Sequence, residues 1–166
     1  MTKPILPERI ASIAESKIGL RESGRPNSGE QIREFLAADS YKPNATDDGY
    51  PWCAAFVCRI VQLAMEGREW TFKRPTTPGA WAFEDWSLAQ DRSTWTRRPP
   101  GEDVERGDIV IFNFSHIGIC VRGPDERGMI KTVEGNTNDA GSREGDGVYR
   151  KIRPLASIRS RIRFRV

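Results

Sequence analysis

The spacing of apolar residues changes partway along this chain, and that change constrains the fold more than any other feature of the sequence. In the first half they recur every three or four positions, which is typical of amphipathic helices. From residue 107 onward they form β-branched or alternating runs between turn residues, which is typical of strands joined by hairpins. Helices followed by strands predict an α+β fold, in which an antiparallel sheet packs against a central helix that begins at Cys53.

The same spacing gives approximate bounds for the elements. Helices are expected at residues 7–20, around 32–36, at 53–65 and at 78–89. Strands are expected at residues 108–114, 116–122, 128–135, 147–154 and 157–166. In the fourth helix, Trp81, Ala82 and Trp86 are expected to face the interior.

Size and composition favour one globular domain over residues 1–166. The chain has 166 residues, of which 37% are hydrophobic and 30% charged, and this balance supports a single core. No segment approaches the roughly 18 apolar residues of a membrane helix, and the first residues lack the features of a signal peptide. We therefore expect a protein made in the cytoplasm without a signal peptide and without stable membrane association.

The cysteine and histidine content argues against a disulfide framework and against a metal site. Three cysteines cannot all pair within one chain, and His116 is the single histidine. A structural zinc site normally needs four such ligands at close spacing. The sequence therefore predicts no metal and no cofactor.

Cys53 stands where a loop becomes a helix. Turn-forming residues precede it at positions 47–51, and an apolar run to about Met65 follows. Two interpretations are open at this point, because the thiol is either a small buried hydrophobic group or a nucleophile. A thiol has an ordinary pKa of about 8.5, but a helix N-terminus and an imidazolium lower it to roughly 3.5–7.5 in reactive cysteines.

His116 opens a predicted strand in which side chains alternate between two faces. Period two places His116, Gly118 and Cys120 on one face, and Ile117, Ile119 and Val121 on the other. The glycine beside the histidine allows a neighbouring group to approach closely. Taken alone, the histidine also fits a hydrogen-bonded core or surface position.

The next predicted strand ends with Glu134 and Asn136, two residues apart and so able to point to one side. A hairpin between the two strands brings one of them next to the His116 ring. Thiol, imidazole and orienting group together form a nucleophilic site, in which the imidazole protonates the leaving amine and the third group fixes the ring. Backbone N–H groups at the helix start can stabilise the oxyanion.

Four short motifs occur in a fixed order: "WCAAFV" at 52–57, "GDIVIF" at 107–112, "HIGICV" at 116–121 and "VEGNT" at 133–137. Together they resemble the CHAP amidases (cysteine-, histidine-dependent amidohydrolases/peptidases) and the wider NlpC/P60 group of cell-wall hydrolases. The resemblance extends over about residues 10–166. It implies a papain-like fold and hydrolysis of amide bonds in peptidoglycan, either between N-acetylmuramic acid and L-alanine or within the stem peptide or cross-bridge.

The resemblance also implies roles for individual residues. Cys53 is expected to be the nucleophile, His116 the base and Glu134 the third member, with Asn136 as a polar partner or substitute. Trp52 and Ser115, which precede the cysteine and the histidine, are the predicted substrate-binding residues. Family members commonly carry glycine at the place of Ser115, and some carry glutamine at the place of Trp52.

Other residues receive structural interpretations. Some phage members carry an acidic calcium loop near the cysteine, but Asp47 and Asp48 are interpreted as turn residues. Cys58 faces another side of its helix than Cys53 and is expected to pack. Cys120 shares the strand face of His116 but lacks a helix terminus to activate it.

The C-terminal strand alternates arginines with apolar residues. The favoured interpretation is a solvated face of an outer strand, whose charges protect its edge. Attraction to anionic wall polymers comes second, and nucleic-acid binding is a weaker alternative. The net charge of +3 is too small to decide among them.

The expected function is hydrolysis of peptidoglycan by a phage or prophage lysin released by a holin, or by an antibacterial effector delivered by a secretion system. An effector is expected to have a cognate immunity protein, and no nucleic-acid partner is expected. The competing hypothesis is a non-catalytic module that binds cell wall or a partner protein on the same fold.

Overall fold

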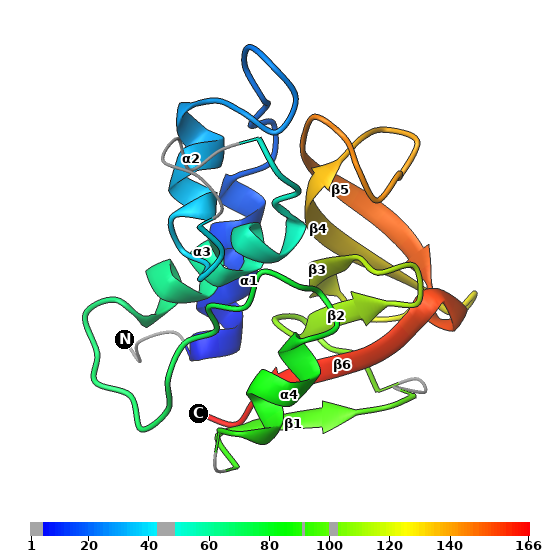
Figure 1. Ribbon diagram of the computed structural model, residues 1–166. Coiled ribbons are helices and arrows are strands. Elements are labelled where there is room, and N and C mark those ends of the chain that lie inside the picture. The colour runs from blue at the N-terminus through cyan, green and yellow to red at the C-terminus, as the bar shows by residue number, and fades with distance from the viewer. Residues whose placement is uncertain (1–4, 43–48, 91, 100–102) are drawn as a thin grey trace.

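The computed structural model describes residues 5–42, 49–90, 92–99 and 103–166, with three helices packed together on one side of a sheet and the fourth beside two of its strands (Figure 1). The helices are α1 (Leu6–Ser16), α2 (Glu30–Leu36), α3 (Cys53–Met65) and α4 (Phe83–Leu88). The strands are β1 (Thr94–Arg97), β2 (Ile109–Phe112), β3 (Ile117–Arg122), β4 (Met129–Thr137), β5 (Gly147–Pro154) and β6 (Ile158–Phe164). A single 3₁₀ turn, Leu155–Ser157, joins the last two strands.

The strands form one sheet in the order β1-β6-β2-β3-β4-β5, with every neighbouring pair antiparallel. Helix α3 packs against β3 and β4, and α1 and α2 lie against α3 (Figure 1). The predicted α+β fold, with the helix that begins at Cys53 packed on an antiparallel sheet, is confirmed. The arrangement is papain-like.

Both faces of β3 are buried, in two separate apolar clusters. Ile117, Ile119 and Val121 join the larger cluster, which the helices share. Cys120 lies in the smaller cluster, with Phe112 and Ile130 among its members. Burial raises the pKa of the Cys120 thiol to about 12, so this thiol stays protonated. The two-faced pattern predicted for this strand is therefore present.

The fourth helix differs from its prediction. It begins only at Phe83, after a turn that contains Pro78 and Gly79. Phe83 and Ser87 are the buried residues of α4, whereas Trp81 and Ala82 are exposed. The prediction that these two residues face inward was wrong, because they precede the helix and do not share its periodicity.

The C-terminal strand also differs from its prediction. It lies inside the sheet, between β1 and β2, and Arg161 is fully buried. Asp103 and Asp108 supply carboxylates to Arg161 and Arg163. The solvated outer strand was therefore a wrong prediction, because paired charges allow arginines to be buried.

Three further points concern the acidic turn, membrane-spanning helices and metal-binding groups. Asp47 and Asp48, interpreted from the sequence as turn residues, lie outside the described residues. Among the residues that are described, no helix is long and apolar enough to cross a membrane. In the same residues, no group of three or more histidine, cysteine, aspartate or glutamate side chains is arranged to hold a metal ion.

Candidate active site

Helix α3 begins at Cys53 without a capping side chain. Trp52 occupies the N-cap position and makes no side-chain hydrogen bond to the helix. Its indole is fully buried, stacks on Phe35 at 5.5 Å and donates from Nε1 to Glu22 Oε1 at 2.8 Å. Serine, threonine, aspartate or asparagine at this position would occupy the first amide groups. Here the N–H groups of the first turn remain available to a ligand.

Strand β4 passes very close to the start of α3. A Cβ atom added to Gly135 would lie 2.7 Å from Phe56 and 2.8 Å from the Trp52 ring. Only glycine permits this approach, since real Cβ atoms do not tolerate such distances. The absence of a side chain at Gly135 therefore lets the strand that carries Glu134 run beside the helix that carries Cys53.

His116 lies in the tight turn between β2 and β3. Ser115 adopts a left-handed backbone with φ of 56°, and the Phe112 N–H donates to the His116 carbonyl at 2.9 Å. The imidazole is fully buried and lies nearly parallel to Phe112 and Phe114, with ring centroids 6.0 and 5.9 Å away. These two rings fix the plane of the imidazole.

Glu134 is the hydrogen-bond partner of His116. The distance from His116 Nε2 to Glu134 Oε2 is 3.0 Å, and both side chains are fully buried. A Cβ atom added to Gly118 would lie 2.6 Å from Glu134 Cγ. The glycine expected to admit a neighbouring group therefore admits this carboxylate.

The Glu134 carboxylate has two further partners that the sequence did not reveal. Arg153 on β5 donates from Nε to Oε1 at 2.9 Å and from Nη2 to Oε2 at 2.6 Å. Thr132 donates its hydroxyl to Oε1 at 2.6 Å. The guanidinium itself lies against the Phe112 and Phe114 rings. Both oxygens are thus held by donors, and bidentate pairing fixes the orientation of the carboxylate.

The charges of Glu134 and His116 stabilise each other. Burial alone would raise the pKa of Glu134, but hydrogen bonds from Arg153 and His116 outweigh it and lower that pKa to about 2. Burial alone would lower the pKa of His116, but Cys53 and Glu134 outweigh it and raise that pKa to about 9. The site therefore favours a carboxylate and an imidazolium at neutral pH.

The second ring nitrogen of His116 is the one left for chemistry. Nδ1 is buried and makes no well-formed hydrogen bond with any described residue. Cys53 nevertheless acts on the ring strongly enough to raise its pKa. The thiol is thus close to the imidazole but not aligned as a hydrogen-bond partner, which is common in enzymes without bound substrate.

The other predicted site residues occupy different positions. Asn136 is buried beyond Glu134, and its Oδ1 accepts from the Gly145 N–H at 3.4 Å. Trp52 lies beneath the start of α3 with no exposed surface, and Ser115 is half-buried in the turn before the histidine. The structure therefore brings Cys53, His116 and Glu134 together, and Glu134 is the residue bonded to the ring.

Comparison with protein families agrees with this geometry. The model of the CHAP domain matches residues 45–136, more than half of the chain, and that segment contains Cys53, His116 and Glu134. No curated protein matches the sequence. CHAP domains are in general cysteine- and histidine-dependent amidohydrolases or peptidases that act on peptidoglycan. The chain therefore belongs to the CHAP-domain family and is, at the level of that family, a peptidoglycan hydrolase of the amidase or peptidase type.

Proposed function

We propose that the protein cleaves an amide bond of peptidoglycan with Cys53 as nucleophile, His116 as acid and base, and Glu134 as the residue that orients the imidazole. The bond lies between N-acetylmuramic acid and L-alanine or within the stem peptide or cross-bridge. The observation that carries this proposal is the buried His116–Glu134 pair, which leaves Nδ1 unpaired beside Cys53.

Glu134 determines which ring nitrogen reacts. Its ionised carboxylate accepts a hydrogen bond from Nε2–H, so Nε2 carries hydrogen in both charge states of the ring. Nδ1 is then the atom that gains and loses a proton during the reaction. Arg153 keeps the carboxylate charged and in place.

In the acylation step, the Cys53 sulfur bonds to the carbonyl carbon of the scissile amide. The oxygen takes up negative charge, which the free N–H groups at the start of α3 stabilise. His116 Nδ1 gives its proton to the leaving nitrogen as the carbon–nitrogen bond breaks. The products are a thioester on Cys53 and a free amine.

In the deacylation step, neutral Nδ1 takes a proton from water as the water oxygen bonds to the thioester carbon. The carbon–sulfur bond breaks, releasing a carboxylic acid and restoring the thiolate and the imidazolium. Overall, one water molecule is consumed and one amide becomes an amine and an acid.

The primary test is digestion of purified peptidoglycan by the wild type and by Cys53→Ala, with mass spectrometry of the released fragments. The wild type alone is expected to release fragments, and their new termini identify the bond. Absence of cleavage in several wall types, from a protein that is folded by circular dichroism, would contradict the proposal and favour a binding module.

Thiol alkylation tests the pairing of Cys53 and His116 without a substrate. The wild type is expected to react with iodoacetamide well below pH 8, and His116→Ala to lose that reactivity. Cys58 and Cys120 are buried and provide internal references in the same digest. Equal alkylation rates of Cys53 in both proteins would contradict the pairing.

We infer that the protein acts on the cell wall from the outer side of the cytoplasmic membrane, as a lysin released by a holin or as a delivered effector with an immunity protein. Expression with a cleavable export signal is expected to lyse a Gram-negative host, whereas cytoplasmic expression leaves it intact. Equal toxicity of both forms, or of exported Cys53→Ala, would contradict this location.

A further inference from the structure

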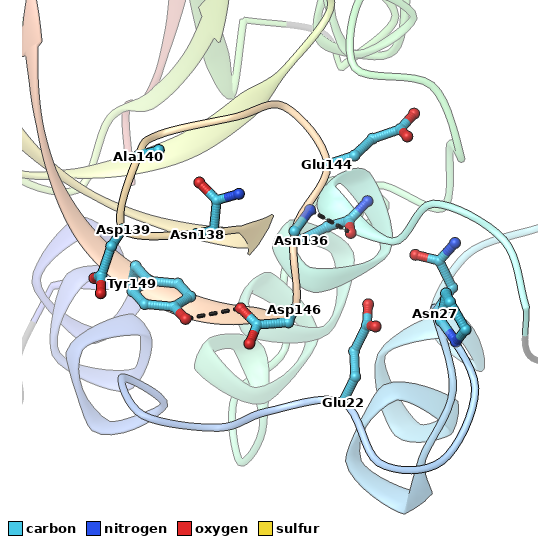
Figure 2. Close-up of a pocket in the computed structure, with 11 residues that line it drawn as sticks. Glu22, Asn27, Asn136, Asn138, Asp139, Ala140, Glu144, Asp146 and Tyr149 are labelled. Atoms are coloured by element: carbon cyan, nitrogen blue, oxygen red, sulfur yellow. Dashed lines mark hydrogen bonds between the residues drawn. The ribbon is translucent and has the colours of Figure 1, made fainter.

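A cavity of about 640 Å³ opens beside the start of α3, between the loop before α2 and the β4–β5 loop (Figure 2). Its lining includes four carboxylates, those of Glu22, Asp139, Glu144 and Asp146. Among the described residues, no lysine or arginine lines it. We call this cavity the acidic pocket. Its charge indicates a cationic ligand.

Two basic residues near the pocket donate to backbone carbonyls, and a third approaches one of its carboxylates. Lys151 donates to the backbone carbonyls of Asn138 and Asp139, and Arg21 donates to carbonyls while lying over the Tyr149 ring. Arg143 approaches Glu144 at 3.8 Å, with both side chains more than half exposed. Among the contacts of the described residues given above, the pair with Glu144 is exposed, so it screens the charge of the pocket only weakly.

Asn136 supplies the second observation that points to a ligand. The residue is 1% exposed and is among those that line the pocket (Figure 2). The Gly145 N–H donates to its Oδ1, which fixes the amide orientation. Its Nδ2 atom is buried and has no partner among the described residues. A buried amide donor without an acceptor is costly, and a ligand carbonyl can supply that acceptor.

The two observations together define the ligand chemistry. The carboxylates of the pocket favour a cation, and Asn136 offers a donor to a carbonyl oxygen within the same cavity. In the residues that are described, the carboxylates do not converge into a metal-binding group. An organic ammonium group with an adjacent amide therefore fits better than a metal ion.

The pocket is linked to helix α3, which carries the nucleophile, and to strand β4, which carries Glu134. Glu22 accepts the Trp52 N–H, and Trp52 immediately precedes Cys53. Asn136 follows Glu134 by two residues on β4. A ligand in the pocket would thus contact Glu22, which is bonded to Trp52, and Asn136, which shares β4 with Glu134.

We propose that the acidic pocket is a substrate subsite that binds a free primary ammonium group of the stem peptide, while Asn136 Nδ2 donates to a carbonyl of that peptide. This rests on the proposed function, since it names the part of peptidoglycan that the site recognises. The pocket selects stem peptides that carry an unmodified diamino acid over those in which that amine is acylated.

The test measures binding to the full-length Cys53→Ala protein by calorimetry, in a buffer that contains EDTA so that divalent cations cannot contribute. The probes are the synthetic peptide N-acetyl-L-Ala-D-Glu-L-Lys-D-Ala and the same peptide with an acetylated lysine ε-amine, so that the lysine amine is the only ammonium that differs between them. Acetylation is expected to weaken binding about three- to tenfold, the range of one or two partly exposed ion pairs.

A double variant identifies the pocket as the source of this preference. Asp139→Asn with Glu144→Gln removes two exposed charges without touching the hydrogen bonds of Glu22 and Asp146. It is expected to bind both peptides equally. The matched control, Glu69→Gln with Glu126→Gln, removes two exposed charges that do not line the pocket and is expected to keep the preference.

The outcomes separate this proposal from the proposed function. Equal binding of both peptides, no binding of either at millimolar concentration, or a preference that survives the double variant would overturn the subsite. Peptidoglycan cleavage tested on the wild type is independent of these results. A hydrolase without ammonium preference refutes the subsite alone, and an ammonium-selective protein without hydrolysis refutes the function alone.

Discussion

Two buried arrays of arginine and carboxylate groups lie in the same sheet, and they differ in what they leave unpaired. In the first, Arg153 and Thr132 hold Glu134, which holds His116. In the second, Arg161 and Arg163 on β6 pair with Asp103 and Asp108; the loop before β2 contributes the carboxylates. We call these the His116 array and the Arg161 array.

Each member of the Arg161 array has hydrogen-bond partners within the protein. Arg161 donates to Asp103 and to the Trp95 carbonyl, and Arg163 is bidentate to Asp108. Asp108 also accepts the Glu105 N–H at 2.8 Å. The His116 array instead ends on an imidazole nitrogen without a partner. The comparison indicates that a buried ion pair marks a functional site where one of its polar atoms makes no hydrogen bond within the protein.

The largest expected effect is a difference in kcat/KM between substitutions of Glu134 and of Asn136, the acid and the amide on β4. Glu134→Ala removes the group that orients the ring, and we expect it to lower kcat/KM by roughly 10²–10⁴-fold. Asn136→Ala leaves the His116–Glu134 bond intact, so its loss is expected to be smaller. Peptidoglycan turbidity assays on both variants measure this order, and the reverse order would contradict the assignment of Glu134.

Arg153→Met is expected to come next, with a loss of kcat/KM of about tenfold or more. Without the guanidinium, the pKa of Glu134 rises, because Arg153 is its strongest favourable partner. The acidic limb of the pH–rate profile should therefore move to higher pH. Arg150→Met, on the same strand but exposed and paired with Glu15, is the control. An unchanged pH profile for Arg153→Met would mean that this arginine only supports the fold.

Arg161→Met tests the Arg161 array and is expected to lower the stability of the protein without changing its activity. Removal of Arg161 takes the donors from the backbone carbonyls of Asp103 and Trp95, while Arg163 still pairs with both carboxylates. We expect a cost of about 1–3 kcal/mol in the free energy of unfolding, the range for a buried acceptor that loses its donor. The kcat of the folded fraction is expected to stay within about twofold of the wild type. Arg97→Met, which removes an exposed partner of the same Asp103, should cost less than about 1 kcal/mol in urea unfolding. A catalytic defect in Arg161→Met would remove the distinction between the arrays.

The smallest effect concerns the pH dependence of stability. The pKa of His116 is raised from 6.5 to about 9 on folding, so its contribution is complete below pH 6.5 and is lost as the pH rises through 9. The pKa of Glu134 is lowered from 4.5 to about 2, so its contribution exists above pH 4.5 and is lost as the pH falls toward 2. Urea unfolding of the wild type and His116→Gln between pH 6 and 9.5 should show a difference that shrinks with rising pH. A constant difference would mean that the ring is not protonated in the native state.

Local signals were enough to predict helix α3 and the His116–Glu134 contact. Turn residues and a helical apolar period bound α3 at Cys53 and Met65, as observed. His116 and Glu134 lie near the ends of strands that are adjacent in sequence, so a hairpin brings them together without long-range information. Gly118 between them was a further local sign of close packing.

Features that depend on register and distant pairing could not be predicted in this way. Arg161 appeared solvated because its partner Asp103 lies 58 residues earlier, in another part of the chain. Arg153 shares a sheet face with Thr132 and Glu134, but only the β4–β5 register reveals it. Strand β1 is four residues long and gains its place by pairing with β6, so its own sequence carries little signal.

Gly118 has a consequence for deciding which relatives of this protein are enzymes. A methyl group at that place would occupy the space of the Glu134 side chain, 2.6 Å from Cγ. A chain could then retain cysteine, histidine and glutamate at the matching positions and still be unable to hold the carboxylate against the ring. Inspection of the motifs alone would classify such a chain as an active hydrolase. The residue two places after the histidine is thus a diagnostic position. It can distinguish active hydrolases from inactive homologues that only bind the cell wall or a partner protein.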